Sequence, residues 1–102
     1  MFVVTSSAKE KLHQAIQQFS NKPGMSIRIR LAHGIPDQIN LIFDWQKAGD
    51  YVVKDTSGRK IMLVAPEVFA ELDGMVFDYA ASEENTGFVL LPLSSTNGNW
   101  RH

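Results

Sequence analysis

Apolar residues recur at helical spacing near the start of the chain. The positions concerned are Ala8, Leu12, Ala15, Ile16 and Phe19. Intervals of three and four residues place these side chains on one face of a helix, with polar residues covering the other face. Ser7 and Glu10 have the spacing of a capping box, which predicts the start of the helix. Pro23-Gly24 predicts its end, so we expect one long N-terminal helix.

The next two segments, 25–31 and 39–45, alternate apolar and polar residues with a period of two. This period is typical of a strand with one buried face. Gly34 and Pro36 lie between the two segments and indicate a loop, so the strands are expected to form a hairpin. On the buried face we place Met25, Ile27, Ile29, Leu31, Ile39, Leu41, Phe43 and Trp45.

Turn residues divide the second half of the chain into short apolar runs. Residues 55–58, Asp-Thr-Ser-Gly, predict the turn of a second hairpin. Pro66 fits the first turn of a short helix, and Gly74 is placed to end it. Further strands are expected at 51–54, 60–64, 75–80 and 86–92. Two helices and about six strands, joined mostly by hairpins, favour an α+β domain on a mainly antiparallel sheet.

Composition indicates a single globular domain and argues against several classes of partner. The chain has 102 residues, a formal net charge of -1 and 44% hydrophobic residues. The longest basic cluster is Arg59-Lys60, which is too short to neutralise a run of phosphates, so we expect no nucleic-acid partner. Apolar runs are too short to span a bilayer and no secretion leader is evident, so we expect a cytoplasmic protein without a membrane partner.

The sequence contains no cysteine, and this excludes thiolate clusters, disulfides and cysteine nucleophiles. Candidate acid-base groups are also poorly placed, because Glu83-Glu84 fall in a polar loop and Asp73 in a turn. The segment 94–96, Ser-Ser-Thr, has no base beside it. We therefore expect a protein that is not an enzyme, with no catalytic and no cofactor-binding residue.

We expect three charged or titratable side chains to lie on the surface in contact with solvent. Arg28 and Arg30 leave the same face of their strand, where an anion site or a docking patch is conceivable. We interpret them as solvated residues, since paired surface arginines usually are. His13 lies on the polar face of the helix, and we interpret it as an ordinary solvated histidine rather than a pH sensor or a ligand.

Several motifs in a fixed order resemble the A-type iron-sulfur carriers, the HesB/IscA-like family. The opening residues, "MFVVTSSAKEKLHQAI", resemble a short strand that leads through a Thr/Ser turn into the first helix of that family. Residues 63–92 contain Leu72-Asp73-Gly74, Asp78-Tyr79, Gly87-Phe88 and Pro92 in the family's order and close to its spacing. The resemblance implies a HesB-like domain over 1–92, as a mainly antiparallel β-sandwich. Composition predicts a flexible C-terminal tail over 93–102.

The same resemblance implies a cysteine-free member of the family. Its members hold iron or a cluster with one loop cysteine and a Cys-Gly-Cys near the C-terminus. Those positions correspond here to Gly34 or Ile35 and to Asn97-Gly98-Asn99. Asparagine is a neutral, weak ligand that cannot replace a thiolate, so we expect no cofactor and transfer no metal residue.

The sequence therefore favours a regulatory or protein-interaction protein with an as yet unidentified protein partner, monomeric by default. Its resemblance to cysteine-free relatives implies a role in bacterial dissimilatory sulfur oxidation. The alternative is an iron donor or sensor that binds ferrous iron through imidazole and oxygen ligands. The residues for that alternative are His33, Asp37, Asn97, Asn99 and His102. Binding to an RNA leader or promoter is a third possibility, and the charge balance argues against it.

Overall fold

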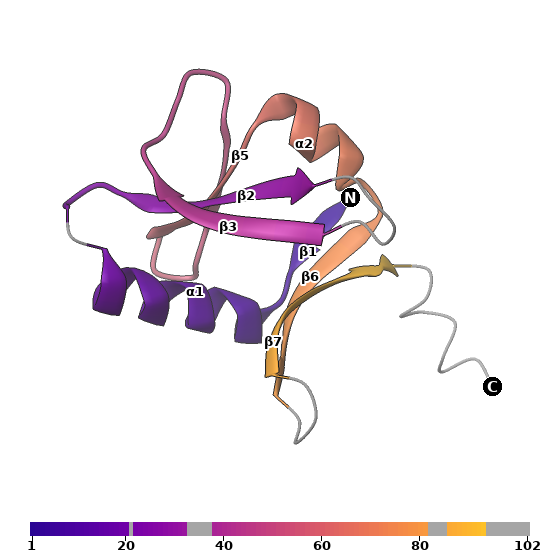
Figure 1. The fold of residues 1–102 in the computed structure, drawn as a ribbon, viewed down its shortest axis with the longest axis horizontal. Helices are drawn as coiled ribbons and strands as arrows, with labels where there is room; N and C mark the ends of the chain where they lie inside the picture. Colours follow the sequence, from indigo (N-terminus) through magenta and orange to yellow (C-terminus); the bar gives the residue numbers. More distant parts are fainter. Residues whose placement is uncertain (21, 33–37, 82–85, 94–102) are drawn as a thin grey trace.

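The computed structural model describes residues 1–20, 22–32, 38–81 and 86–93. These residues form two helices and seven strands (Figure 1). In chain order the elements are β1 (Phe2–Val4), α1 (Ser6–Phe19), β2 (Ser26–Ala32), β3 (Gln38–Asp44), β4 (Tyr51–Lys54), β5 (Lys60–Val64), α2 (Pro66–Glu71), β6 (Met75–Ala81) and β7 (Thr86–Pro92).

The strands form two sheets, one of four strands in the order β3-β2-β5-β4 and one of three in the order β1-β6-β7. The pairs β2–β3, β4–β5 and β6–β7 are antiparallel, whereas β2–β5 and β1–β6 are parallel. Both predicted hairpins and the α+β class are confirmed. The sheets are mixed, and the sandwich arrangement stays a prediction.

Helix α1 packs against β2, β5 and β6 and so joins the two sheets around one core (Figure 1). Leu12 of α1 and Phe77 of β6 are both completely buried. Strand β5 lies inside the four-stranded sheet, and its residues 61–64 are buried on both faces. The buried core consists of Ala8, Leu12, Ile27, Ile29, Ile61, Met62, Val64, Leu72 and Phe77.

The predicted capping box at Ser7 is wrong, because helix α1 is capped by Thr5. The Thr5 hydroxyl accepts a hydrogen bond from the Ala8 backbone N–H at 3.2 Å. It also donates to Asp78 Oδ1 at 2.6 Å, which ties the start of α1 to β6. Ser7 lies inside the first helical turn and is exposed. The tertiary contact with Asp78 therefore fixes the cap at Thr5.

Strand β1 raises the number of strands from about six to seven. Its three residues are too few for a periodic signal, although the family resemblance anticipates them.

Helix α2 begins at Pro66 as predicted, and Gly74 just beyond its end has a φ of 79°. In the described ranges, neither helix is long and apolar enough to cross a membrane. Leu93 donates its N–H to the Gly74 carbonyl at 2.7 Å, and the predicted tail lies outside the described residues from 94 onward.

Candidate functional site

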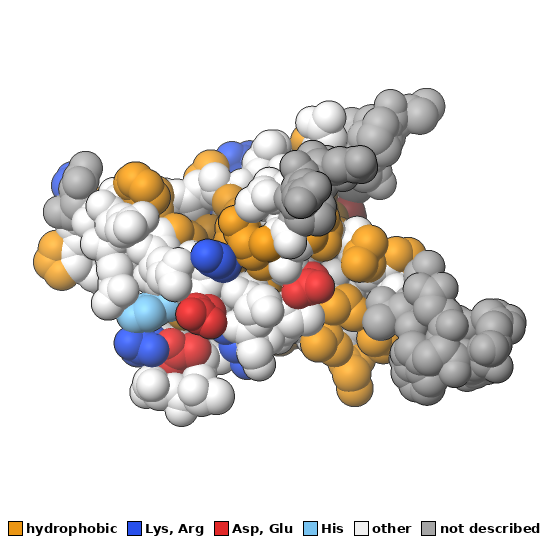
Figure 2. All heavy atoms as spheres, turned by 90° about the horizontal axis from the view of Figure 1, so that it is seen from below, with side chains coloured by type: hydrophobic (Ala, Val, Ile, Leu, Met, Phe, Trp, Pro, Cys, Tyr) orange, Lys and Arg blue, Asp and Glu red, His pale blue; other side chains and the backbone are white. Residues whose placement is uncertain are grey.

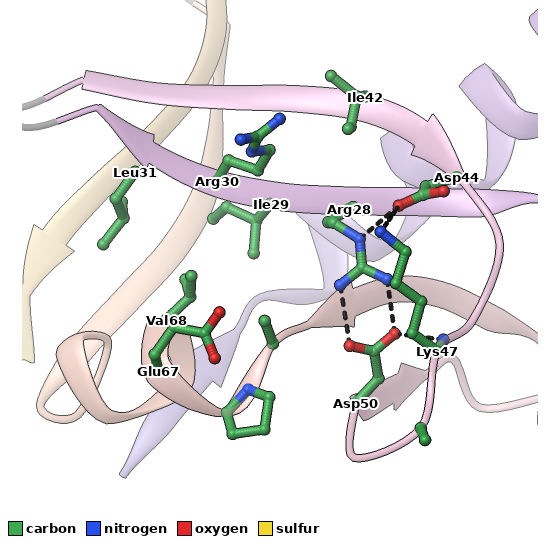
Figure 3. Close-up of a pocket in the computed structure, with 13 residues that line it drawn as sticks. Arg28, Ile29, Arg30, Leu31, Ile42, Asp44, Lys47, Asp50, Glu67 and Val68 are labelled. Carbon is green, nitrogen blue, oxygen red and sulfur yellow. Dashed lines mark hydrogen bonds and ion pairs between the residues drawn. The ribbon is translucent and has the colours of Figure 1, made fainter.

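Arg28 is the charged centre of the four-stranded sheet, and its predicted solvation is wrong. Its exposed fraction is 6%, whereas Arg30, two residues along the same strand face, is exposed. The guanidinium donates from Nε to Asp44 Oδ2 at 2.7 Å. It also donates from Nη1 and Nη2 to the two carboxylate oxygens of Asp50, at 2.9 and 2.6 Å (Figure 3). A buried charge requires such partners, because an unpaired one would be very costly.

This network shifts the pKa values of its members in the directions expected for mutual stabilisation. Hydrogen bonds from Arg28 lower the pKa of Asp50 to about 2. The pKa of Asp44 is lowered mainly by the hydrogen bond from the same guanidinium and, to a smaller extent, by the hydrogen bond from the Trp45 backbone N–H. Hydrogen bonding to Asp50 raises the pKa of Arg28. All three groups are therefore charged at neutral pH.

The network also fixes the loop between β3 and β4, which begins at Trp45. Asp44 Oδ1 accepts the Trp45 N–H at 2.8 Å, and Arg28 Nη2 donates to the Trp45 carbonyl at 3.2 Å. Asp50 closes the loop by accepting the Lys47 N–H at 2.7 Å. Because both backbone polar groups of Trp45 are held in this way, its position is set by buried charges.

The side chain of Trp45 is not buried on the sheet face, contrary to the sequence prediction. Strand β3 ends at Asp44, and the Trp45 side chain is 48% exposed. The alternating pattern predicted a strand that is one residue too long. The hydrogen bonds of the Trp45 backbone to Asp44 and Arg28 turn the chain out of the sheet at this point.

Trp45 lines a depression of about 280 Å³ where α1 ends and β2 begins. Phe19, the last residue of α1, lines it as well and is 64% exposed. The lining residues are Phe19, Ser20, Lys22, Met25, Phe43 and Trp45, and we call this surface the aromatic depression. Figure 2 shows hydrophobic side chains reaching the surface at the end of the molecule where α1 ends. No described lining residue is acidic.

One lysine lines the aromatic depression, and a second bonds the residue that follows Trp45. Lys22 Nζ lies 5.5 Å from the centroid of the Trp45 ring, within the range of a cation–π contact. Lys60 Nζ donates to the side-chain oxygen of Gln46, the residue after Trp45, at 2.9 Å. The carboxylates of Asp44 and Asp50 bind Arg28 instead, and Lys47 Nζ lies 3.5 Å from Asp44 Oδ2. The border of the depression is therefore positively charged.

A second hollow, of about 520 Å³, lies between β2, β3 and α2 above the Arg28 network. Figure 3 shows Asp50 and Asp44 turned toward Arg28, whereas Arg30 lies away from them along β2. The buried charges in this hollow bond one another, and Lys47 Nζ lies 3.5 Å from Asp44 Oδ2. We therefore interpret this hollow as the solvent-facing side of an ion network that stabilises the fold, and not as a ligand site.

His13 also differs from its predicted solvated state. It is half-buried, and its Nε2 atom lies 2.7 Å from Arg59 Nη1. Because a guanidinium has only donors, the imidazole nitrogen accepts this hydrogen bond. Arg59 Nε in turn donates to Asp55 Oδ2 at 2.7 Å. His13 thus helps to attach α1 to the turn between β4 and β5.

The predicted alternative metal residues all lie outside the described part of the chain. These are His33, Asp37, Asn97, Asn99 and His102, together with the positions that the resemblance matches to the family's cysteines, 34 or 35 and 97–99. Among the residues that the structure describes, no three histidines or carboxylates form a group that could hold a metal ion. Glu83-Glu84 and residues 94–96 are likewise outside these ranges, and Asp73 is exposed in its turn.

A sequence signal for the Arg28 network exists in the predicted hairpin. The observed register pairs Ser26 with Asp44 and Arg28 with Ile42, so Arg28 and Asp44 are diagonal neighbours on one face. Opposite charges at such positions indicate an ion pair. Asp50 carries no comparable signal, because the loop brings it to Arg28 only in the folded chain.

Comparison with solved structures identifies the fold. SufA from Escherichia coli, a protein involved in the biosynthesis of iron-sulfur clusters, matches with a TM-score of 0.69 and 18% identity, over 89% of this chain and 84% of SufA. IscA with a [2Fe-2S] cluster matches with a TM-score of 0.63 and 19% identity, over 90% of this chain and 82% of IscA. The predicted HesB/IscA-like fold is therefore confirmed.

A protein from Aquifex aeolicus, whose structure was solved by solution NMR, has a TM-score of 0.63 and 27% identity. The match covers 87% of this chain and 88% of that protein. No family model matches this chain, and none of the curated proteins is significantly similar to it in sequence.

Proposed function

We propose that this chain is a non-enzymatic protein-interaction or regulatory protein built on the scaffold of the A-type iron-sulfur carriers. The observation that carries the proposal is the aromatic depression. Phe19 is 64% exposed and Trp45 is 48% exposed, and both line this depression. A buried ion network holds the loop that carries Trp45. Such a surface is costly to leave in water and suits a protein partner.

The composition of the aromatic depression also supports a protein partner. Its lining includes phenylalanine, tryptophan and methionine, which are enriched in protein interfaces. Its volume of about 280 Å³ lies just below the range of roughly 300 to 1,000 Å³ that holds drug-sized ligands. A single large side chain of a partner fits this space better than a cofactor does.

The absence of cysteine gives the proposal its second support. IscA was solved with a [2Fe-2S] cluster and SufA is involved in the biosynthesis of iron-sulfur clusters, whereas this chain contains no thiolate to hold a cluster. The sequence also resembles DsrR, a cysteine-free carrier-like protein associated with dissimilatory sulfur oxidation. We propose the sulfur-oxidation machinery of a bacterium as the setting of the interaction.

Affinity purification of the tagged chain from cross-linked cells of its own source tests this function. We expect one or more proteins to be enriched over an untagged control, to the same extent with and without an iron chelator. Enrichment that disappears with the chelator would favour the iron donor or sensor instead. If no protein is enriched in either condition, the interaction proposal is wrong.

A further inference from the structure

We propose that the aromatic depression binds a partner segment in which one large apolar side chain is flanked by aspartate or glutamate. This inference rests on the proposed function and names the surface and the chemistry of the partner. It follows from three properties of the depression: its exposed aromatic walls, its positively charged border and its fixed backbone.

The aromatic walls supply the anchor site. Phe19 and Trp45 are 64% and 48% exposed, and Phe43 and Met25, both half-buried, add to the apolar lining. A side chain inserted between them would remove apolar surface of both partners from water, at about 25 cal/mol per Å². Buried aromatic anchors of this kind supply most of the binding energy in many interfaces.

The charged border selects the flanks of the segment. Lys22 stands over the Trp45 ring, and Lys60 lies beside the next residue, Gln46. Arg28 and Lys47 together balance the carboxylates of Asp44 and Asp50, so these two carboxylates do not neutralise either lysine. An acidic flank would complement the two ammonium groups, whereas a basic flank would be repelled.

The fixed backbone makes the site ready to bind. Trp45 has its N–H bonded to Asp44 and its carbonyl bonded to the buried Arg28 guanidinium. Ser20, the C-cap residue just after α1, donates its N–H to the Ile16 carbonyl and its hydroxyl to the Lys22 carbonyl. Residues on both sides of the depression are therefore ordered before a partner arrives, which lowers the entropy cost of binding.

Short synthetic peptides, titrated into the full isotope-labelled chain and followed by amide NMR, test this inference. One set has a central tryptophan or leucine flanked by aspartate and glutamate, and the matched set has lysine flanks. We expect the acidic set to shift the amides of Lys22, Phe43 and Trp45, and the basic set to leave them unchanged. Salt at about 1 M, where the Debye length falls to roughly 3 Å, should weaken the binding several-fold.

Two substitutions in the depression and one control complete the test. Trp45→Ser and Lys22→Glu should each weaken binding of the acidic peptides at least about tenfold. Tyr51→Ser is the matched control, because Tyr51 is also half exposed but stacks on Phe69 away from the depression. Equal binding of acidic and basic peptides, shifts elsewhere on the chain, or unchanged affinity in Trp45→Ser would overturn the inference.

The same variants separate this inference from the proposed function. A partner from the source cells that is retained by Tyr51→Ser and lost by Trp45→Ser supports both. A partner retained equally by both variants leaves the proposed function standing and overturns the assignment of the surface. If the unaltered chain retains no partner, the proposed function itself fails, independently of the peptide result.

Discussion

Arg28 and Asp50 lie side by side in two parallel hydrogen bonds, although they are separated by 22 positions in the sequence. The Asp50 side chain is 3% exposed and the Arg28 side chain 7%, so water contributes little to either charge. The pair stands behind the loop that carries Trp45. Stability and the presentation of the aromatic depression are therefore linked through one guanidinium.

Replacing Arg28 by methionine should destabilise the fold strongly, because Asp50 would remain buried without its cation. Loss of one partner of a buried ion pair costs about 3 to 5 kcal/mol. Arg30→Met is the matched control, since Arg30 is exposed on the same strand face, and it should change stability by less than about 0.5 kcal/mol. Urea unfolding of the two variants measures the difference.

Adding Asp50→Asn to Arg28→Met should recover part of the lost stability, because it removes the unpaired buried charge. If the double variant is as unstable as the sum of the two single variants, Arg28 and Asp50 do not act as a pair. The NMR shift of the Trp45 amide should also change in Arg28→Met and not in Arg30→Met, because only Arg28 bonds the Trp45 carbonyl.

The free energy of unfolding should fall when the pH is lowered through the range from about 4 to 2. Arg28 lowers the pKa of Asp50 from 3.8 to about 2. A group whose pKa is lowered by folding stabilises the fold above its unfolded pKa and loses this contribution as the pH falls through the folded value. At about 1.4 kcal/mol for each pKa unit, the difference between 3.8 and about 2 corresponds to roughly 2 to 3 kcal/mol of stability.

Urea unfolding at several pH values in this range measures the effect, with Asp50→Asn as the comparison. The variant should show a weaker pH dependence between about pH 4 and 2. Some dependence should remain, because the pKa of Asp44 is also lowered by Arg28. Identical slopes for the two proteins would contradict the role given to Asp50.

Thr5→Ala should lower the free energy of unfolding by about 1 to 2 kcal/mol, because it removes the N-cap of α1. The substitution deletes both the acceptor for the Ala8 N–H and the donor to Asp78. Ser7→Ala is the matched control, since Ser7 is exposed inside the helix and alanine is a better helix former. A larger loss in Ser7→Ala than in Thr5→Ala would restore the predicted capping box.

Much of the secondary structure follows from local patterns in the sequence. The predicted strands 51–54 and 60–64 agree with β4 and β5, because turn residues 55–58 separate two short apolar runs. Helix α2 starts at Pro66 for an equally local reason, since proline favours the first helical turn. These elements depend on neighbours in the sequence and were accessible without the structure.

The errors in the prediction arise where a distant residue decides the local structure. Alternation assigned Arg28 to a solvated face, and its burial became visible only with Asp50 in place. Asp78, on β6, similarly moves the cap of α1 from Ser7 to Thr5. The aromatic depression was missed because it combines the end of α1 with the end of β3, which no sequence period connects.

Ferrous iron should leave the amide NMR spectrum of the chain unchanged under anaerobic conditions. The described residues contain no group of three histidines or carboxylates that could hold a metal ion, and the sequence contains no cysteine thiolate. The alternative predicts localised paramagnetic broadening at His33, Asp37, Asn97, Asn99 and His102. An anaerobic titration to excess iron, read residue by residue, distinguishes the two.

The control for the iron titration is His33→Ala, which removes one imidazole of the alternative site. Broadening that disappears in this variant would show that iron is held through His33, and the iron donor or sensor would replace the interaction protein as the preferred function. Broadening that persists in His33→Ala would instead indicate weak binding to scattered surface carboxylates. Carboxylates bind divalent cations without imidazole, so excess magnesium should then compete with the iron and remove the broadening.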